Sequence, residues 1–187
     1  MIYGVTPVLS AMGKGVANGH PLSAVMGIRE ILELCTEIFF SGSFGGENLS
    51  LAAAKEVLTL VKSGDGTKKL ELTGSKIIEG VSKIVADNEL NEIFSISGHP
   101  SWSFINIARK SIDETMLLKT LFLQEMFKRG ILILSTHNIS YAHSSSDVIK
   151  LLAAYSETMG IIKNSLRNNN VRDYLECEPL KLLFKVR

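Results

Sequence analysis

The sequence predicts an α/β segment followed by an α+β segment. Short strand-like runs alternate with helical patterns in residues 1–64, whereas a pair of strand-like runs follows the long helices of the second part. A Gly-Asp-Gly break at residues 64–66 separates the two patterns. We therefore expect two domains, at residues 1–64 and 65–187.

Four elements are expected in the first segment. Residues 1–10 are apolar and β-branched and are interrupted by Pro7, which is typical of a strand that runs into a loop. Small apolar residues predict a strand at 21–27, and a short amphipathic helix follows at 29–38. Residues 49–61 predict a long helix.

The second segment begins with a long helix and continues with strands. Residues 68–87 carry apolar side chains at helical spacing and predict the helix. Strand-like alternation at 93–97 and 101–108 is separated by a Gly-His-Pro turn, so a hairpin or a sheet corner is expected there.

The rest of the chain predicts two more helices around a strand. Ser111-Ile112-Asp113-Glu114 is a capping-box pattern, which opens a helix that reaches about Lys128 and is stopped by Gly130. Residues 131–134 predict a buried strand. A final long helix is expected from about Ser145, and the tail behind it contains a short helical pattern.

A polar loop is expected between this strand and the last helix, at residues 135–143. It contains two histidines, an asparagine and a tyrosine, namely His137, Asn138, Tyr141 and His143. Such loops can bind ligands. Histidine and asparagine more commonly cap helices or pack in the core, so we favour these uses over ligand contact for each of the four residues.

Composition excludes several classes of function. Hydrophobic residues make up 45% of the chain and charged residues 21%, which is typical of a globular protein rather than a disordered one. The formal net charge is +1 without a basic stripe, so nucleic acid is not expected as a partner. No run of residues has the length of a membrane span or the pattern of a signal peptide, so we expect a soluble protein without a membrane partner.

The cysteines and histidines indicate neither a disulfide framework nor a metal site. Cys35 and Cys177 are far apart in the sequence and form no CxxC pair, which fits a reducing cytoplasm. The four histidines are scattered and belong to no metal-binding pattern, so no metal is expected.

Lys14 is the first candidate for chemistry, because it stands between Gly13 and Gly15. Glycine allows positive φ values and leaves room for a planar group beside the amine, and a neutral lysine amine can form a Schiff base. A solvated lysine on a surface turn is the alternative. Two nucleotide motifs fail here, because Val8 and Asn18 stand where the P-loop and the dinucleotide fingerprint need glycine.

A second candidate is the loop at residues 39–50, which is rich in glycine and hydroxyl groups and leads into a long helix. Free N–H groups at a helix start, the helix dipole and the hydroxyls of Ser41 and Ser43 together suit a phosphate group. The alternative is an ordinary loop in which a serine or asparagine caps the helix.

Together and in this order, the two candidates resemble the class III, fold type I, pyridoxal-phosphate aminotransferases. Gly13-Lys14, Gly19, Pro21 and Ala24 are similar to the family's cofactor-lysine signature. Residues 41–46, Ser-Gly-Ser-Phe-Gly-Gly, resemble the loop that holds the cofactor phosphate of the neighbouring subunit. The resemblance spans nearly the whole chain and is greatest to members like glutamate-1-semialdehyde aminomutase.

The resemblance implies a cofactor, a reaction and a partner. Lys14 would form the internal aldimine with pyridoxal 5'-phosphate and later move a proton as a general base. The Ser43 hydroxyl and the Gly42 backbone would bind the phosphate. Residues 1–64 would be the end of the large cofactor domain and 65–187 the small domain. A homodimer with the site at its interface and a small amino or oxo substrate are implied as well.

The sequence also departs from the family pattern. Three features of the family have no counterpart here: the aspartate that pairs with the pyridine nitrogen, the aromatic residue that stacks on the ring, and the first phosphate loop. In addition, Val8 stands where the family commonly has Asp, and Ser43 where it commonly has Thr. We therefore expect the C-terminal portion of an enzyme, weak or inactive by itself. The alternative is a non-catalytic dimerisation or interaction fragment that retains the small-domain fold.

Overall fold

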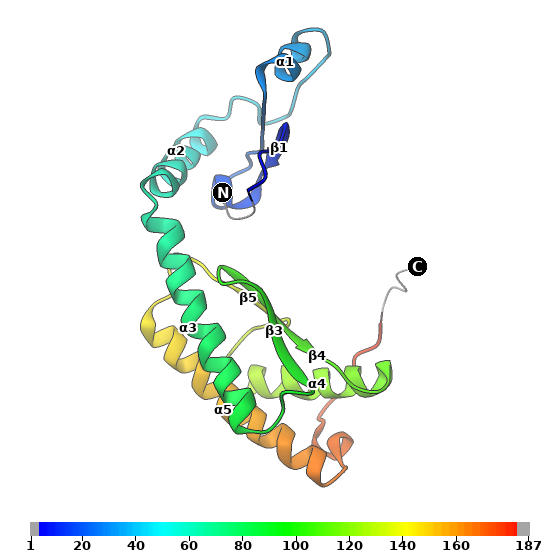
Figure 1. The fold of residues 1–187 in the computed structure, drawn as a ribbon. Helices are drawn as coiled ribbons and strands as arrows, with labels where there is room; N and C mark the ends of the chain where they lie inside the picture. The colour runs from blue at the N-terminus through cyan, green and yellow to red at the C-terminus, as the bar shows by residue number, and fades with distance from the viewer. Residues whose placement is uncertain (1–3, 183–187) are drawn as a thin grey trace. The chain divides into compact units, whose positions relative to one another are not determined.

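The chain divides into two compact units, Met1–Gly66 and Thr67–Arg187. A computed structural model describes residues 4–182, and Figure 1 labels most of the helices and strands along the chain. The two units are described separately.

The first unit is built on a two-stranded antiparallel ribbon and one long helix. Strand β1 (Leu9–Met12) pairs with β2 (Ala24–Gly27), so the pairing runs from Leu9 opposite Gly27 to Met12 opposite Ala24. The 3-10 helix η1 (Lys14–Val16) lies in the connection between them. The long helix α2 (Asn48–Ser63) confirms the helix predicted at 49–61.

Two predicted elements of this unit differ in the structure. The strand expected to run into a loop within residues 1–10 was misplaced, because residues 4–8 form no regular element and β1 starts at Leu9; residues 1–3 of that prediction lie outside the described part of the chain. The helix predicted at 29–38 consists of α1 (Arg29–Leu32) and the 3-10 helix η2 (Glu33–Thr36). Neither short helix has a buried residue, so no packing supports a longer regular helix.

The core of the first unit is small. Its buried apolar side chains are Val16, Ala17 and Ala54, with Leu22 and Ala53 packed against them. Much of the remaining apolar surface is exposed, on the ribbon, on the loop before α2 and on α2 itself. The exposed large apolar side chains include Leu9, Val25, Met26, Phe39, Phe40, Phe44, Leu49, Leu51, Leu58 and Val61.

The second unit contains a three-stranded antiparallel sheet. Strands β3 (Phe94–His99), β4 (Trp102–Ile107) and β5 (Thr136–Asn138) have the order β3-β4-β5. The predicted hairpin between β3 and β4 is confirmed, with His99 opposite Trp102 at its tip. Gly98 has a φ of +94°, which glycine adopts without strain and which suits the tight connection.

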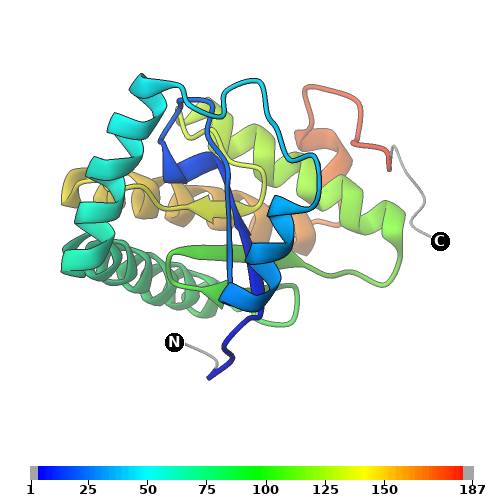
Figure 2. The ribbon, with the colours of Figure 1, turned by 90° about the horizontal axis from the view of Figure 1, so that it is seen from above.

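Three helices pack with this sheet. They are α3 (Asp65–Asp87), α4 (Ile112–Lys128) and α5 (Ser145–Arg167), and the 3-10 helix η3 (Val171–Tyr174) follows in the tail. Helices α4 and α5 lie against each other on one face of the sheet (Figure 2). The predicted cap at Ser111 is confirmed, because its hydroxyl accepts the N–H of Glu114.

The strand predicted at residues 131–134 was wrong. The third strand lies at Thr136–Asn138, inside the segment that was expected to be a polar loop. Leu132 and Leu134 point away from the core and are 88% and 71% exposed, whereas His137 is buried and pairs with Ser103 of β4. Pairing with β4 therefore decides the strand position, and an apolar run is not sufficient for it.

The core of the second unit is closed around aromatic rings. Phe122 of α4 contacts Phe94 of β3 and Tyr155 of α5, with ring centroids 6.2 Å and 5.7 Å apart. Aliphatic side chains of all three helices and of the sheet surround these rings. The buried members include Ile77, Val81, Val85, Ile105, Leu118, Leu121, Met126, Met159 and Ile162.

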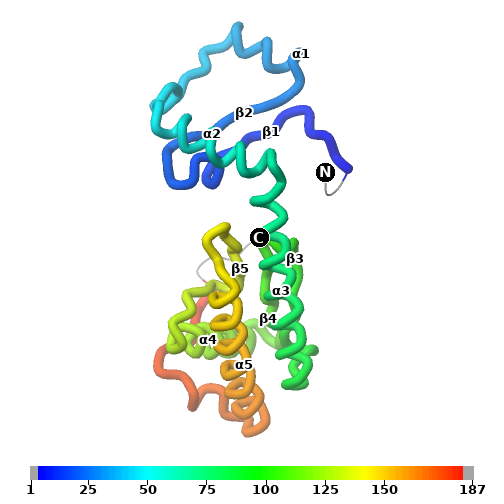
Figure 3. Tube along the Cα trace, turned by 90° about the vertical axis from the view of Figure 1, so that its left-hand side faces the viewer, coloured from blue at the N-terminus to red at the C-terminus, as the bar shows by residue number. Residues whose placement is uncertain are grey.

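Two glycines of α3 allow close approach of its neighbours. A Cβ at Gly80 would lie 2.6 Å from Leu152 of α5, and the two helices run side by side there (Figures 1 and 3). A Cβ at Gly74 would overlap the backbone carbonyl of Pro100 in the β3–β4 turn. A backbone carbonyl cannot rotate away as a side chain can, so Gly74 is the more constrained position.

We predict that Gly74→Ala lowers the free energy of unfolding by about 2 kcal/mol, because the added methyl group must displace the β3–β4 turn. Gly160→Ala is the matched control, since Gly160 is also helical but nothing lies within 4 Å of its added Cβ. The control should raise stability by up to about 1 kcal/mol. Urea unfolding followed by the fluorescence of Trp102 checks both, and equal effects would contradict the contact.

Candidate functional site

Lys14 lies on the connection between β1 and β2. It is exposed and opens η1, where the N–H of Val16 donates to the carbonyl of Gly13 at 3.2 Å. The structure gives Lys14 a φ of +52° and Gly13 a φ of −158°. The positive φ expected of the flanking glycines therefore belongs to the lysine itself, which is a strained position for a residue with a side chain.

Packing below the turn holds this conformation. Val16 and Ala17 are buried against Ala54 of α2, whereas Lys14 is exposed. Among residues 4–182, no hydrogen bond or ion pair involves the amine of Lys14. The turn thus presents a lysine amine that is free to react with a bound group.

The second candidate segment is the loop in front of α2. The N–H of Gly45 donates to the carbonyl of Gly42 at 3.0 Å, and the N–H of Glu47 donates to Phe44 at 3.2 Å. Gly42 and Ser43 are exposed, and a Cβ on Gly42 would meet nothing within 4 Å. This turn leaves its backbone open to a ligand.

Glu47 caps α2, in place of the serine or asparagine that the sequence suggested. Its carboxylate accepts the N–H groups of Leu49 and Ser50 at 2.9 Å and 2.6 Å, and the Ser50 hydroxyl donates to it at 2.5 Å. The bond from the Ser50 hydroxyl and then the two backbone bonds lower the pKa of Glu47. Two of the N–H groups expected to serve an anion are therefore already used.

The two candidate segments belong to the same unit and are linked through η1 and α2. Ala54 of α2 packs on the turn that carries Lys14, and the charge of His20 contributes to the lowered pKa of Glu47. Within the described residues, no hydrogen bond joins Lys14 to Gly42 or to Ser43. The structure thus connects the segments by packing and not by direct polar contact.

His137 from the predicted polar loop is part of a buried hydrogen-bond chain. Its Nδ1 lies 2.9 Å from the hydroxyl of Ser103, and its Nε2 lies 2.7 Å from the hydroxyl of Tyr155. All three side chains are buried, and they join β4, β5 and α5. This polar chain is consequently part of the core, where each ring nitrogen has a partner.

Burial keeps both rings of this chain uncharged at neutral pH. It lowers the pKa of His137 to about 4, because the imidazolium would lose its hydration. Burial also raises the pKa of the Tyr155 hydroxyl, so that tyrosine stays protonated. A neutral histidine can donate through one nitrogen and accept through the other, which suits two hydroxyl partners.

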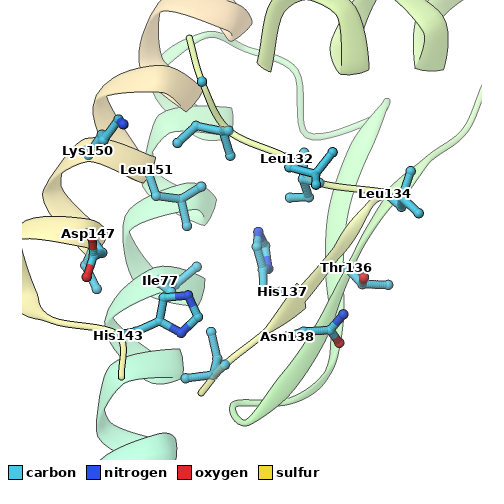
Figure 4. A pocket seen from close by; sticks show the side chains of 15 residues that line it. Ile77, Leu132, Leu134, Thr136, His137, Asn138, His143, Asp147, Lys150 and Leu151 are labelled. Carbon is cyan, nitrogen blue, oxygen red and sulfur yellow. The ribbon is translucent and has the colours of Figure 1, made fainter. Parts of the chain in front are cut away.

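A pocket of about 570 Å³ lies beside this chain, between α3, residues 130–139 and the start of α5 (Figure 4). Its lining is mainly aliphatic, and its polar members include His143, which precedes α5, and Asp147 and Lys150 of α5. Tyr141 lies outside the lining, where its ring lies 4.1 Å from the amine of Lys69. The polar loop therefore divides between the core, the pocket and the surface.

Two features of these sites have no clear local signal in the sequence. The usual N-cap residues are Ser, Thr, Asp and Asn, so capping preferences do not single out Glu47. The partners of His137 are 34 and 18 residues away in the sequence, so no local pattern identifies them. In the described part of the chain, no His, Cys, Asp and Glu side chains form a group of three that could hold a metal ion.

No helix in the described range of the chain combines the length and apolar character needed to cross a membrane.

Comparison with known proteins gives a consistent family. The family model of the class-III aminotransferases matches residues 1–164.

Curated relatives include glutamate-1-semialdehyde 2,1-aminomutases. The protein of Methanosarcina acetivorans is 31% identical over 84% of this chain and 40% of its own length, and that of Methanococcoides burtonii is 28% identical over 82% and 39%. The solved FumI protein of Sphingopyxis sp. MTA144, in its PLP internal aldimine form, has a TM-score of 0.76 and 25% identity over 88% of this chain and 39% of its own. The chain spans about two fifths of the length of these relatives.

We predict that stability falls as the pH drops from 6.5 towards 4, because the unfolded chain then binds a proton at His137 that the folded chain does not. The loss should reach up to about 3 kcal/mol and should be absent above pH 6.5. Urea unfolding of the second unit across this range, followed by Trp102, measures it. His137→Gln should flatten the slope between pH 6.5 and 4, and an unchanged slope in this variant would contradict the assignment.

Proposed function

The chain belongs to the class III aminotransferase family, and from this membership we propose that it carries part of a pyridoxal-phosphate-dependent site for amino-group transfer. Lys14 is the cofactor lysine in this proposal, and Ser43 with the Gly42 backbone binds the cofactor phosphate. The observation that carries it is the free amine of Lys14, presented by a strained turn that is anchored on α2.

The residues present fit this cofactor at the lysine. A Cβ on Gly15 would meet nothing within 4 Å, and one on Gly13 would come no closer than 3.8 Å to the protein. The space around the amine is therefore open to a planar ring. The left-handed backbone at Lys14 supports the fit, since strained conformations concentrate at functional sites.

When bound, pyridoxal phosphate supplies an aldehyde for the lysine amine and a ring that accepts electrons from the substrate. This chain would place the Nζ of Lys14 within reach of the cofactor aldehyde. When Nζ is not bonded to the cofactor, it could take a proton from the substrate carbon and return it. Because Val16 and Ala17 hold the backbone of the turn, Nζ can move only by rotation of the Lys14 side chain.

The loop before α2 is suited to hold a phosphate through neutral groups. The hydroxyl of Ser43 has no recorded partner within residues 4–182 and can donate to a phosphate oxygen. The carboxylate of Glu47 is engaged by Leu49 and Ser50, which turns its charge to the helix end. Exposed N–H groups of the glycine-rich turn can supply further donors.

We further propose that residues 1–64 are the end of a large cofactor domain and 65–187 a small C-terminal domain of a cytoplasmic homodimer. The many exposed apolar side chains of the first unit support a covered interface, because single apolar side chains on a surface are ordinary but broad patches are not. The substrate would be a small amino or oxo compound.

The same exposed surface supports a second candidate function, a non-catalytic dimerisation or interaction fragment. Such a fragment needs the apolar surface but has no use for a reactive lysine. Binding of the cofactor at Lys14 therefore separates the two candidates.

We predict that incubation with pyridoxal phosphate followed by borohydride reduction labels Lys14 ahead of the other lysines. Lys14→Arg keeps the charge but cannot form the bond, so the preferred label should disappear. Lys62→Arg, a change on the exposed surface of the same unit, should leave it intact. Peptide mass mapping measures the result, and label spread evenly over surface lysines would refute the role of Lys14.

We predict that Ser43→Ala weakens cofactor binding about tenfold, because one hydrogen bond to a charged phosphate is lost. Ser43→Thr keeps the hydroxyl and should bind within about threefold of the original chain. Titration of the chain with pyridoxal phosphate, followed by absorbance, gives the dissociation constants. Unchanged affinity in Ser43→Ala would remove Ser43 from the phosphate site.

A further inference from the structure

We propose that residues 131–138 form an acceptor edge for an extended polypeptide segment with apolar side chains at alternate positions and one carboxylate. The segment would lie beside β5 as an added strand and place an apolar side chain in the adjacent pocket. This inference concerns the second unit and does not depend on the cofactor site.

The backbone is the first observation that supports an acceptor edge. Within the described residues, the N–H and C=O groups of Leu132, Ile133 and Leu134 form no hydrogen bond. Hydrogen bonds of 3.0 Å hold the segment at both ends. The N–H of Ile131 donates to the carbonyl of Met126, and the carbonyl of Ser135 accepts the N–H of Ile105. β5 pairs only with β4 in the described sheet, so its other edge continues this unpaired row.

The side chains of the segment are the second observation. Ile133 is 6% exposed and anchors the segment to the core, whereas Leu132 and Leu134 project from it. An apolar run with this alternation has the character of a paired strand, which is why the sequence predicted one. Leucines exposed to this extent on an unpaired edge are typical of a surface that another strand covers.

The pocket is the third observation, because it opens directly beside this edge. Leu132 and Leu134 lie on one of its sides and Leu151 of α5 on the other (Figure 4). Its volume of about 570 Å³ is larger than a single side chain needs, so one or two apolar side chains of an added strand can enter. Strand addition generally takes affinity from backbone bonds and specificity from such side-chain pockets.

Charge complementarity indicates the carboxylate. Lys150 lines the pocket and forms no ion pair within residues 4–182, and its amine lies 3.8 Å from where a Cβ on Gly130 would stand. Asp147, the acidic side chain of the lining, accepts the N–H and the hydroxyl of Ser144 at 2.8 Å and 2.7 Å; these bonds, and then the nearby charges of His143 and Lys150, lower its pKa, but Asp147 makes no direct ion pair with Lys150 within residues 4–182. An acidic residue near the end of the incoming segment can therefore pair with Lys150.

An extended peptide suits these features better than a small amphipathic acid. A small acid could occupy the pocket and reach Lys150, but it would leave the row of backbone groups on residues 132–134 unpaired. Only another extended backbone offers donors and acceptors at matching intervals.

The probes are blocked synthetic peptides acetyl-Asp-Xaa-Thr-Xaa-Thr-Xaa-amide, with Xaa as Val, Ile, Leu or Phe, and decanoate as the small acid. Calorimetry with the full chain measures affinity, and amide chemical shifts locate the site. We expect at least one peptide to bind saturably, with shifts centred on residues 131–138. Replacing the Asp of the peptide with Asn should weaken its binding to the original chain. The same replacement should not change binding to the Lys150→Met variant, because the partner of the carboxylate is then absent.

Two variants at one exposed position test the backbone contact. Leu132→Pro removes an N–H group and should weaken peptide binding about tenfold, whereas Leu132→Ala keeps it and should stay within about threefold. Thermal melts of both variants confirm that the second unit is folded. Saturable binding of decanoate without any peptide, binding centred elsewhere, no binding by the whole set, or equal affinity of the Pro and Ala variants would each overturn the proposal.

Discussion

The fold of the second unit depends on how its core accommodates polar groups. Tyr155 and His137 are buried among aliphatic side chains, and an unpaired hydroxyl or imidazole there would cost more than most single contacts return. Their mutual bond, together with Ser103, satisfies these groups and ties β4, β5 and α5 together. The position of β5 follows from this pairing, and the unpaired segment before it follows from the position of β5.

The first unit, in contrast, has a small core and a large exposed apolar surface. Its few buried apolar side chains hold one turn and one helix, while the ribbon and the loop before α2 remain uncovered. A two-stranded ribbon by itself is marginally stable, and the small core of this unit adds little to its stability. The strained backbone of Lys14 lies in this unit, and covering the unit would also take the lysine away from bulk water.

Local patterns predicted the parts of the fold that depend on local interactions. The long helices, the cap at Ser111 and the hairpin at Gly98 all follow from periodicity, capping and turn chemistry. The strand at 131–134 was wrong because strand position depends on a partner far away in the sequence. At the candidate site, the glycines around Lys14 correctly indicated an unusual turn, but not that the lysine would take the positive φ. Capping preferences do not predict the cap by Glu47, because glutamate is not among the usual N-cap residues.

The second unit is stabilised by its own core, whereas the first unit, which carries Lys14, is not. Native-state hydrogen exchange of the full chain tests it most directly. We expect the amides of α4 and α5 to exchange only through global unfolding, and those of β1 and β2 to exchange through much smaller local openings. Equal protection of the β1–β2 ribbon and of α4 and α5 would show that the first unit is as stable as the second.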